Sequence, residues 1–80
     1  MKQYPSLKKA IAGKNFNIEL IYDNGEKRQF DFTPNLMHPF YKELEDENLF
    51  VQMRVENGEL MWASGQDFCP NTLYEKSILL

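Results

Sequence analysis

Two Asn-Gly dipeptides, at positions 24–25 and 57–58, constrain the fold of this chain more than any other feature of its sequence. Each lies between two runs in which apolar and polar residues alternate, a pattern that predicts two antiparallel strands joined by a tight turn. Hydrophobic residues make up 42% of the chain and aromatic residues 14%, which supports a packed core rather than disorder. With 80 residues, we expect a single domain over residues 1–80.

The register of the first hairpin follows from the need to bury its aromatic side chains. A two-residue loop would pair Leu20 with Gln29 and would turn the phenylalanines of the second strand to the wrong face. A three-residue loop, 23–25, instead pairs Ile18 with Phe30. We therefore predict a type I turn whose last residue, a glycine, adopts the left-handed conformation of a bulge-type loop.

The second hairpin fits a tighter turn. A two-residue loop pairs Val55 with Leu60. It also pairs Met53 with Trp62, and all four side chains then share a face with Val51. This arrangement predicts a type I′ turn without a bulge.

A further strand precedes the first hairpin and is predicted to join it through a tight turn at Gly13-Lys14. That turn would place Leu7 and Ile11 on the buried face. Lys9 falls on the same face, so its charged end is expected to reach past the sheet edge to solvent.

The segment between the two hairpins is predicted to be helical in short pieces. Thr33 is expected to cap the first piece, ahead of a proline. Pro39 prevents one continuous helix, because proline lacks a backbone donor and clashes with the preceding turn. Phe40 and Leu44 have the spacing of one helical face, and Asp46 is expected to cap a last turn.

A C-terminal helix is predicted to repeat this device, with Cys69 as its cap and Pro70 at its first position. The expected fold class is therefore α+β. Its expected elements are a three-stranded antiparallel meander (about 6–12, 15–22 and 26–32), a short helical connection (about 34–50), a β-hairpin (about 51–56 and 59–63) and a C-terminal short helix (about 70–77).

The charge is uneven along the chain. Nine basic and 12 acidic residues give a net charge of −3, which disfavours nucleic-acid binding because such proteins rely on a basic surface. Residues 1–28 nevertheless carry six basic residues against three acidic ones. Nucleic acid therefore stays open as a partner but is not favoured.

Cysteine content and hydropathy favour the cytoplasm. The single cysteine, Cys69, excludes an internal disulfide. No stretch approaches the roughly 20 apolar residues of a membrane span, and the first residues lack the apolar run of a signal peptide. We expect a cytoplasmic protein without a membrane partner.

No combination of residues matches a known catalytic or metal site. Cys69 and His38 could supply a nucleophile and a base, but nothing in the sequence places them together. With Asp67 and Asp31 they are the available metal ligands, and their spacing matches neither zinc nor calcium sites. The acidic residues within 43–47 are typical of a solvated face. We expect no enzymatic activity, no metal and no cofactor.

The segment from Trp62 to Tyr74 carries a specific resemblance to a known family. The shared features extend over most of the chain and here are Asp23-Asn24-Gly25, Phe30-Asp31, Phe40, Leu44, Leu49-Phe50, Trp62, Asp67, Pro70, Leu73 and Tyr74. They resemble domain of unknown function 2442, a family of small, mostly bacterial domains. Relatives often carry Ser or Asp at the position of Cys69, which implies a capping role there.

The resemblance implies an α+β fold and no established activity. Similar domains occur alone, joined to a helix-turn-helix, or beside a second small protein in a toxin–antitoxin-like arrangement.

We interpret the chain as a small non-enzymatic binding module that acts through protein–protein contacts. The candidate interaction surface is Trp62, Asp67, Cys69, Pro70 and Tyr74. Asp67 is expected to accept hydrogen bonds from backbone donors in its loop. The main alternative is a DNA-associated regulator or antitoxin-like partner of a second small protein. A small enzyme using Asp67, Cys69 and Tyr74 is the least favoured interpretation.

A candidate association tail remains once the core is assigned. Ile21 and Met61 fall on the opposite face of the predicted strands, and three consecutive aliphatic residues follow the last helix: Ile78, Leu79 and Leu80. Either the tail folds back onto the sheet, or it meets another chain. We favour a homodimer, because a small domain gains proportionally more from added burial and two-fold dimers are the commonest assemblies.

Overall fold

The first Asn-Gly turn forms as predicted in the computed structural model, which describes residues 4–80. The strands of this hairpin are β2 (Asn17–Tyr22) and β3 (Lys27–Asp31). Ile18 lies opposite Phe30, so the predicted register is confirmed. A 3.0 Å hydrogen bond from the Gly25 amide closes the three-residue loop, and this glycine has a φ of 91°.

The second hairpin consists of β4 (Met53–Glu56) and β5 (Glu59–Trp62). Met53 lies opposite Trp62 as predicted, and the turn residues Asn57 and Gly58 have φ values of 52° and 78°. Two positive φ values define a type I′ turn, so this prediction is also confirmed. The placement of Val51 in the strand is wrong, because its backbone is helical (φ −72°, ψ −9°) and its side chain is 57% exposed.

A third hairpin was not predicted. β5 turns back into β6 (Asp67–Phe68) through residues 63–65. The Trp62 amide donates to the Gln66 carbonyl over 2.8 Å, and the Gly65 amide donates to the Trp62 carbonyl over 2.9 Å. Two hydrogen bonds at the equivalent positions close the first hairpin. Gly65, like Gly25, has a positive φ, here 107°. A strand of two residues is too short to show alternation, so the sequence gives no strand signal there.

The connection between β1 (Leu7–Ala12) and β2 is longer than predicted. It contains a short 3-10 helix, η1 (Lys14–Phe16), in which Asn15 and Phe16 have φ values of 56° and 61°. Ala12 consequently lies opposite Ile18. A two-residue turn would have placed it opposite Asn15, so the register is shifted by an odd number of residues.

This shift reverses the faces of β1. The prediction that Ile11 and Lys9 face the core is wrong: both are exposed, and Ile11 is 41% exposed. An odd shift turns every side chain of a strand to the opposite face. Leu7 is buried nevertheless, because the register changes at a bulge between Leu7 and Lys9.

The connection between the hairpins is helical in short pieces, as predicted. They are η2 (Thr33–Met37), η3 (Pro39–Glu45) and α1 (Glu47–Phe50). Asp46 caps α1 by accepting a 2.9 Å hydrogen bond from the Asn48 amide. Thr33 is the first residue of η2 rather than its cap, and its amide donates to the Asp31 carboxylate over 3.0 Å.

The predicted helical face of Phe40 and Leu44 does not form. Leu44 is fully buried, whereas Phe40 is 50% exposed. A 3-10 helix has three residues per turn, so Tyr41 shares the face of Leu44 instead. The Tyr41 ring packs 5.2 Å from the ring of Phe32.

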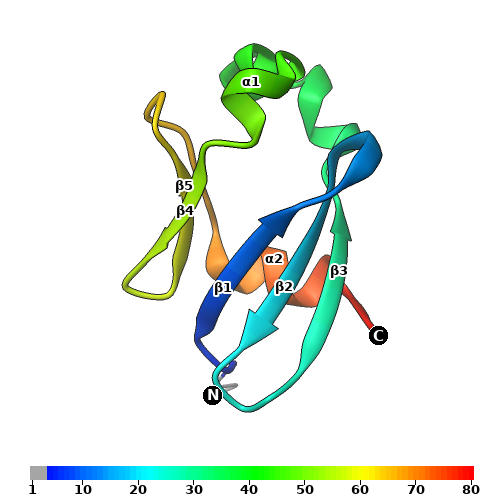
Figure 1. Ribbon diagram of the computed structural model, residues 1–80, viewed down its shortest axis with the longest axis vertical. Coiled ribbons are helices and arrows are strands. Elements are labelled where there is room, and N and C mark those ends of the chain that lie inside the picture. The colour runs from blue at the N-terminus through cyan, green and yellow to red at the C-terminus, as the bar shows by residue number, and fades with distance from the viewer. Residues whose placement is uncertain (1–3) are drawn as a thin grey trace.

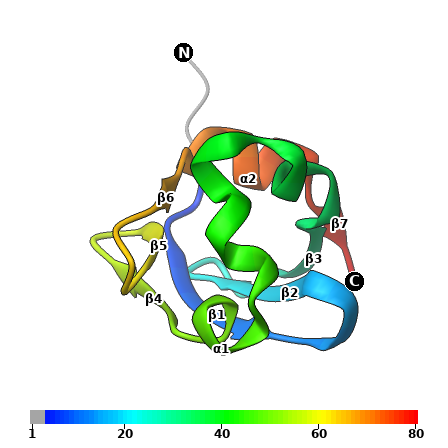
Figure 2. The ribbon, with the colours of Figure 1, turned by 90° about the horizontal axis from the view of Figure 1, so that it is seen from above.

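The chain forms two antiparallel sheets (Figure 1). The large sheet has the strand order β1-β2-β3-β7 and the small sheet the order β4-β5-β6. α2 (Pro70–Lys76) forms as predicted, whereas β7 (Ile78–Leu79) was not predicted. Figure 2 shows α2 and the large sheet on opposite sides of the molecule, so only one face of this sheet is covered.

Phe32 lies at the centre of the core between the two sheets. Its ring is fully buried and packs 5.7 Å from Phe50, 5.1 Å from Trp62 and 5.8 Å from Phe68. The Trp62 indole N–H donates to the Phe50 carbonyl over 2.9 Å, so this large side chain is buried with its polar group satisfied.

The left-handed conformation of Gly25 makes a prediction for stability. Gly25→Ala is expected to lower the free energy of unfolding by about 1 kcal/mol, because a Cβ atom is strained at this φ. Nothing lies within 4 Å of the added Cβ, so a clash with neighbouring atoms does not contribute to the loss. Gly25→Asn should cost less, since Asn tolerates this region. Urea unfolding of the three proteins tests this, and an alanine variant as stable as the natural chain contradicts it.

Candidate functional site

The residues that the sequence suggested as an interaction surface are divided between the core and the surface. Trp62 is 1% exposed and belongs to the core, so it is not a surface residue. Asp67, Cys69 and Pro70 are exposed around the start of α2. Tyr74 is partly buried and packs against Tyr22 with ring centroids 5.1 Å apart.

Gln66, and not Asp67, forms the side-chain hydrogen bonds of this loop. Among the described residues no hydrogen bond reaches the Asp67 carboxylate, and only its backbone carbonyl accepts one, from the Tyr41 hydroxyl at 2.8 Å. Gln66 is 4% exposed, and its side-chain amide donates to the Phe40 carbonyl (3.4 Å) and to the Glu43 carboxylate (3.2 Å). Its side-chain oxygen accepts from the Ser64 hydroxyl. A single glutamine in a polar turn gives no signal by which the sequence could have revealed this.

Cys69 occupies the cap position of α2, but its sulfur does not form a cap hydrogen bond of good geometry. The Thr72 amide, followed by the Thr72 hydroxyl and the Asn71 amide, lowers the pKa of the thiol. Amide donors at the start of a helix favour the thiolate over the thiol. Within residues 4–80 no histidine or carboxylate is hydrogen-bonded to this sulfur, and His38 instead accepts from the Phe40 amide at 3.3 Å.

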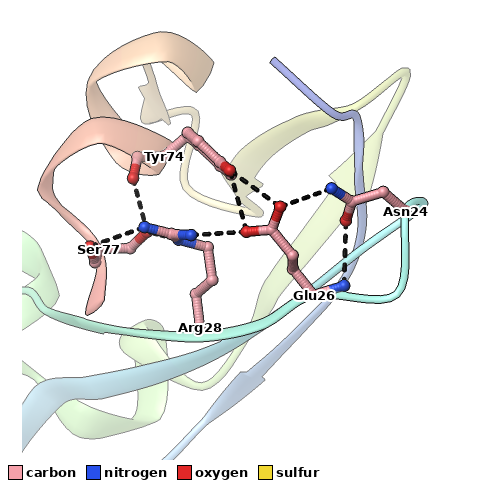
Figure 3. A network of polar contacts seen from close by, with 5 residues as sticks. All are labelled: Asn24, Glu26, Arg28, Tyr74 and Ser77. Atoms are coloured by element: carbon pink, nitrogen blue, oxygen red, sulfur yellow. Dashed lines mark hydrogen bonds and ion pairs between the residues drawn. The ribbon is translucent and has the colours of Figure 1, made fainter. Parts of the chain in front are cut away.

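A polar network joins α2 to the first hairpin (Figure 3). The Glu26 carboxylate lies at its centre and accepts from Arg28 (2.6 Å), from the Tyr74 hydroxyl (2.9 and 3.0 Å) and from the Asn24 amide (2.6 Å). The hydrogen bonds from Asn24, then Arg28 and Tyr74, lower the pKa of Glu26. This carboxylate is therefore held in its charged form, as a salt-bridge partner requires.

Arg28 extends the network to the end of α2. Its Nε donates to the Ser77 hydroxyl over 2.6 Å, and its Nη2 donates to the Ser77 carbonyl over 3.2 Å. The guanidinium carbon lies 4.2 Å from the centroid of the Tyr74 ring, within the range of a cation–π contact. Burial raises the pKa of the neighbouring Tyr22 to about 12, so that phenol stays neutral beside the ion pair. The network fixes the chain at Ser77, directly before β7.

The side of the large sheet that faces away from α2 forms an uncovered surface, here called the outer face. The strand registers assign to it Lys9, Ile11, Asn17, Glu19, Ile21, Lys27, Gln29, Asp31 and Ile78. No other described part of the chain crosses it (Figure 1). Ile11 is 41% and Ile78 is 70% exposed. The expectation that Ile21 lies on this face is confirmed, whereas Ile11 joins it through the unpredicted register of β1.

The remaining features to consider are metal ligands, membrane-spanning helices and grooves. Across residues 4–80 no three His, Cys, Asp or Glu side chains come together as potential metal ligands. No helix in this part of the chain is long and apolar enough to cross a membrane. A groove of about 380 Å³ lies between β3, η2 and α2, where Phe30, Pro34, Phe68 and Ile78 contribute to its lining.

The lowered pKa of Glu26 makes a prediction for pH dependence. A carboxyl group with a lowered pKa stabilises the fold above its unfolded pKa, roughly 4.3, and loses that contribution as the pH falls through the folded value. Glu26→Gln should therefore be less stable than the natural chain at neutral pH, and the difference should shrink below about pH 4. Urea midpoints across this range test it, with Glu59→Gln at an exposed position of the small sheet as the control. A difference that does not change with pH contradicts the role of the charge.

The cap position of Cys69 makes a second prediction. Cys69→Ser is expected to raise the free energy of unfolding by about 0.5 kcal/mol, because a serine oxygen accepts the Thr72 amide better than sulfur does. Cys69→Ala, which removes the acceptor, should not raise it. Thermal or urea unfolding of both variants provides the measurement. A serine variant less stable than the natural chain would show that the thiol has another role.

Comparison with known proteins supports the resemblance suggested by the sequence. No curated protein and no solved structure matches this chain. The family model described as "Protein of unknown function (DUF2442)" matches residues 7–78, which is nearly the whole chain. The chain therefore belongs to the DUF2442 family.

Proposed function

We propose that this domain is a non-enzymatic protein-interaction module that acts in the cytoplasm through the outer face of its large sheet. The observation that carries the proposal is an uncovered sheet face on which Ile11 and Ile78 are 41% and 70% exposed. These two residues lie at opposite edges of the face, on β1 and β7, with Glu19 and Gln29 between them. The proposal therefore rests on the sheet face being uncovered and not on one continuous apolar patch.

The position of β7 supports this proposal. The Leu80 amide donates to the Lys27 carbonyl over 2.9 Å, so the tail continues the large sheet rather than covering it. Ile78 and Leu80 are 70% and 64% exposed and form an aliphatic pair at the β7 edge of the sheet. Of the two outcomes expected for the tail, docking on the sheet face is not what the structure has, and self-association is the form of contact we favour.

The distribution of charge supports a protein partner over nucleic acid. On the outer face Lys9 and Lys27 are accompanied by Glu19 and Asp31, so the basic first third of the sequence does not produce a basic surface there. Arg28 points away from this face and pairs with Glu26. Phosphate binding needs unbalanced positive charge. A DNA-associated regulator or antitoxin-like partner therefore stays the second candidate.

The environment of Cys69 supports a role without catalysis. A cysteine nucleophile needs a base oriented toward it. In the described part of the chain the only hydrogen-bonding groups that act on the thiol are those of Thr72 and Asn71, and His38 is occupied at the start of η3.

Affinity capture from the native host tests the proposed surface. The bait is the full chain, compared with Ile11→Thr/Ile21→Thr, which keeps β-branched residues in the strands but removes apolar surface. The matched control is Met37→Ser/Phe40→Ser, which removes side chains that are 85% and 50% exposed on the helical connection. We expect the proteins captured by the full chain to be absent when the first variant is the bait and present when the control is the bait.

The opposite pattern would place the contact on the helical connection and contradict the proposed surface. Recovery of nucleic acid that disappears at high salt would instead favour the second candidate.

A further inference from the structure

We propose that the outer face binds a second copy of this chain, face to face across a two-fold axis that runs perpendicular to the strands. This inference rests on the proposed function and names its partner. It follows from the order of charged and apolar side chains on the face.

The outer face is polarised along the strand direction. One row across the sheet consists of Lys9, Ile21 and Lys27, which lie opposite one another on β1, β2 and β3. Leu80 continues this row, because its amide is bonded to the Lys27 carbonyl. The side chains of this row carry two positive charges and no negative one.

The next row carries the opposite charge. Ile11, Glu19, Gln29 and Ile78 lie opposite one another across all four strands. Asp31 lies one row further in the same direction. The strand side chains of the face are thus positive toward one end and negative toward the other, although Lys14 borders the negative end, where it lines one hollow with Asn17 and Glu19.

Of two in-plane two-fold axes, one parallel and one perpendicular to the strands, only the perpendicular axis brings unlike charges together. An axis parallel to the strands would stack each row on the same row of the partner and would place lysine near lysine. An axis perpendicular to the strands reverses their direction, so that the Lys9 row stacks on the partner's Glu19 row. Juxtaposed like charges oppose association, and juxtaposed unlike charges select the register.

In this arrangement each Glu19 carboxylate lies between two lysines. The partner's Glu19 is placed over Ile21, with Lys9 and Lys27 on either side at the spacing of neighbouring strands, about 4.8 Å. The same axis places Ile78 against the partner's Leu80 and Ile11 against the alkyl part of the partner's Lys9. A single two-fold rotation therefore packs aliphatic groups against one another and also pairs the unlike charges.

The size of the face makes the dimer weak. Four strands about 4.8 Å apart and roughly 20 Å long give a footprint of about 400 Å² on each partner. Stable interfaces bury about 800 Å² on each side, so association in the micromolar range and sensitivity to salt are expected.

Charge exchange tests this interface. Sedimentation equilibrium of the full chain, from about 5 to about 500 µM, should show a dimer whose dissociation constant rises about tenfold between low and high salt. Glu19→Lys alone and Lys9→Glu/Lys27→Glu alone should each weaken self-association by about a hundredfold. An equimolar mixture of these two variants should form a heterodimer at least as tight as the natural homodimer. Glu59→Lys on the small sheet is the matched control and should dimerise like the natural chain.

Three results would overturn the inference: a natural chain that stays monomeric, a dimer that neither charge variant weakens, and a mixture of the two variants that does not associate. A strictly monomeric chain would leave the proposed function standing, because the capture experiment with Ile11→Thr/Ile21→Thr tests the same face against other proteins. Loss of the dimer in the Glu59→Lys control would place the contact on the small sheet and contradict both proposals.

Discussion

The ion pair between Glu26 and Arg28 ties the first hairpin to the C-terminal helix α2. Its members lie on the first hairpin, and its hydrogen bonds reach Tyr74 and Ser77 at the far end of the sequence. A partly buried ion pair is stabilising only when the remaining donors and acceptors are satisfied, and here Asn24, Tyr74 and Ser77 satisfy them. The planar guanidinium also packs on the Tyr74 ring, which a lysine could not do equally well. The position of β7, and with it the fourth strand of the large sheet, depends on this contact.

The aromatic core attaches the small sheet to the large sheet. Phe32 follows β3 directly and contacts Trp62 from β5 and Phe68 from β6, so one side chain joins the two sheets. The indole N–H of Trp62 is bonded to the Phe50 carbonyl, which adds a directional contact to otherwise non-directional packing. A chain of 80 residues buries a smaller fraction of its surface than a larger domain does, and large aromatic side chains compensate for this by burying more area per residue.

The sequence predicted those features that depend on neighbouring residues and missed those that depend on distant ones. The two Asn-Gly hairpins were predictable to the residue, because alternation and turn length determine the register locally. The register of β1 was not predictable, since no sequence pattern indicates the left-handed conformations of Asn15 and Phe16 that lengthen the turn after this strand. β6 and β7 have two residues each and no periodicity, and Gln66 acquires its role only from a distant carbonyl and carboxylate. Tyr74 was chosen through the resemblance to a family, and its partners in the network could not have been inferred from its neighbours.

The two-residue period of β3 links the network to the outer face. Lys27 and Arg28 are adjacent in sequence and equal in charge, yet the alternation of a strand sends them to opposite sides of the sheet. Arg28 is directed inward, where Glu26 neutralises it, whereas Lys27 is directed outward and has no ion-pair partner in the described residues. Glu19 is likewise exposed and without such a partner there. The charge inside the molecule is therefore compensated by the fold itself, whereas the charges on the outer face are exposed to solvent and lie in neighbouring rows of opposite sign.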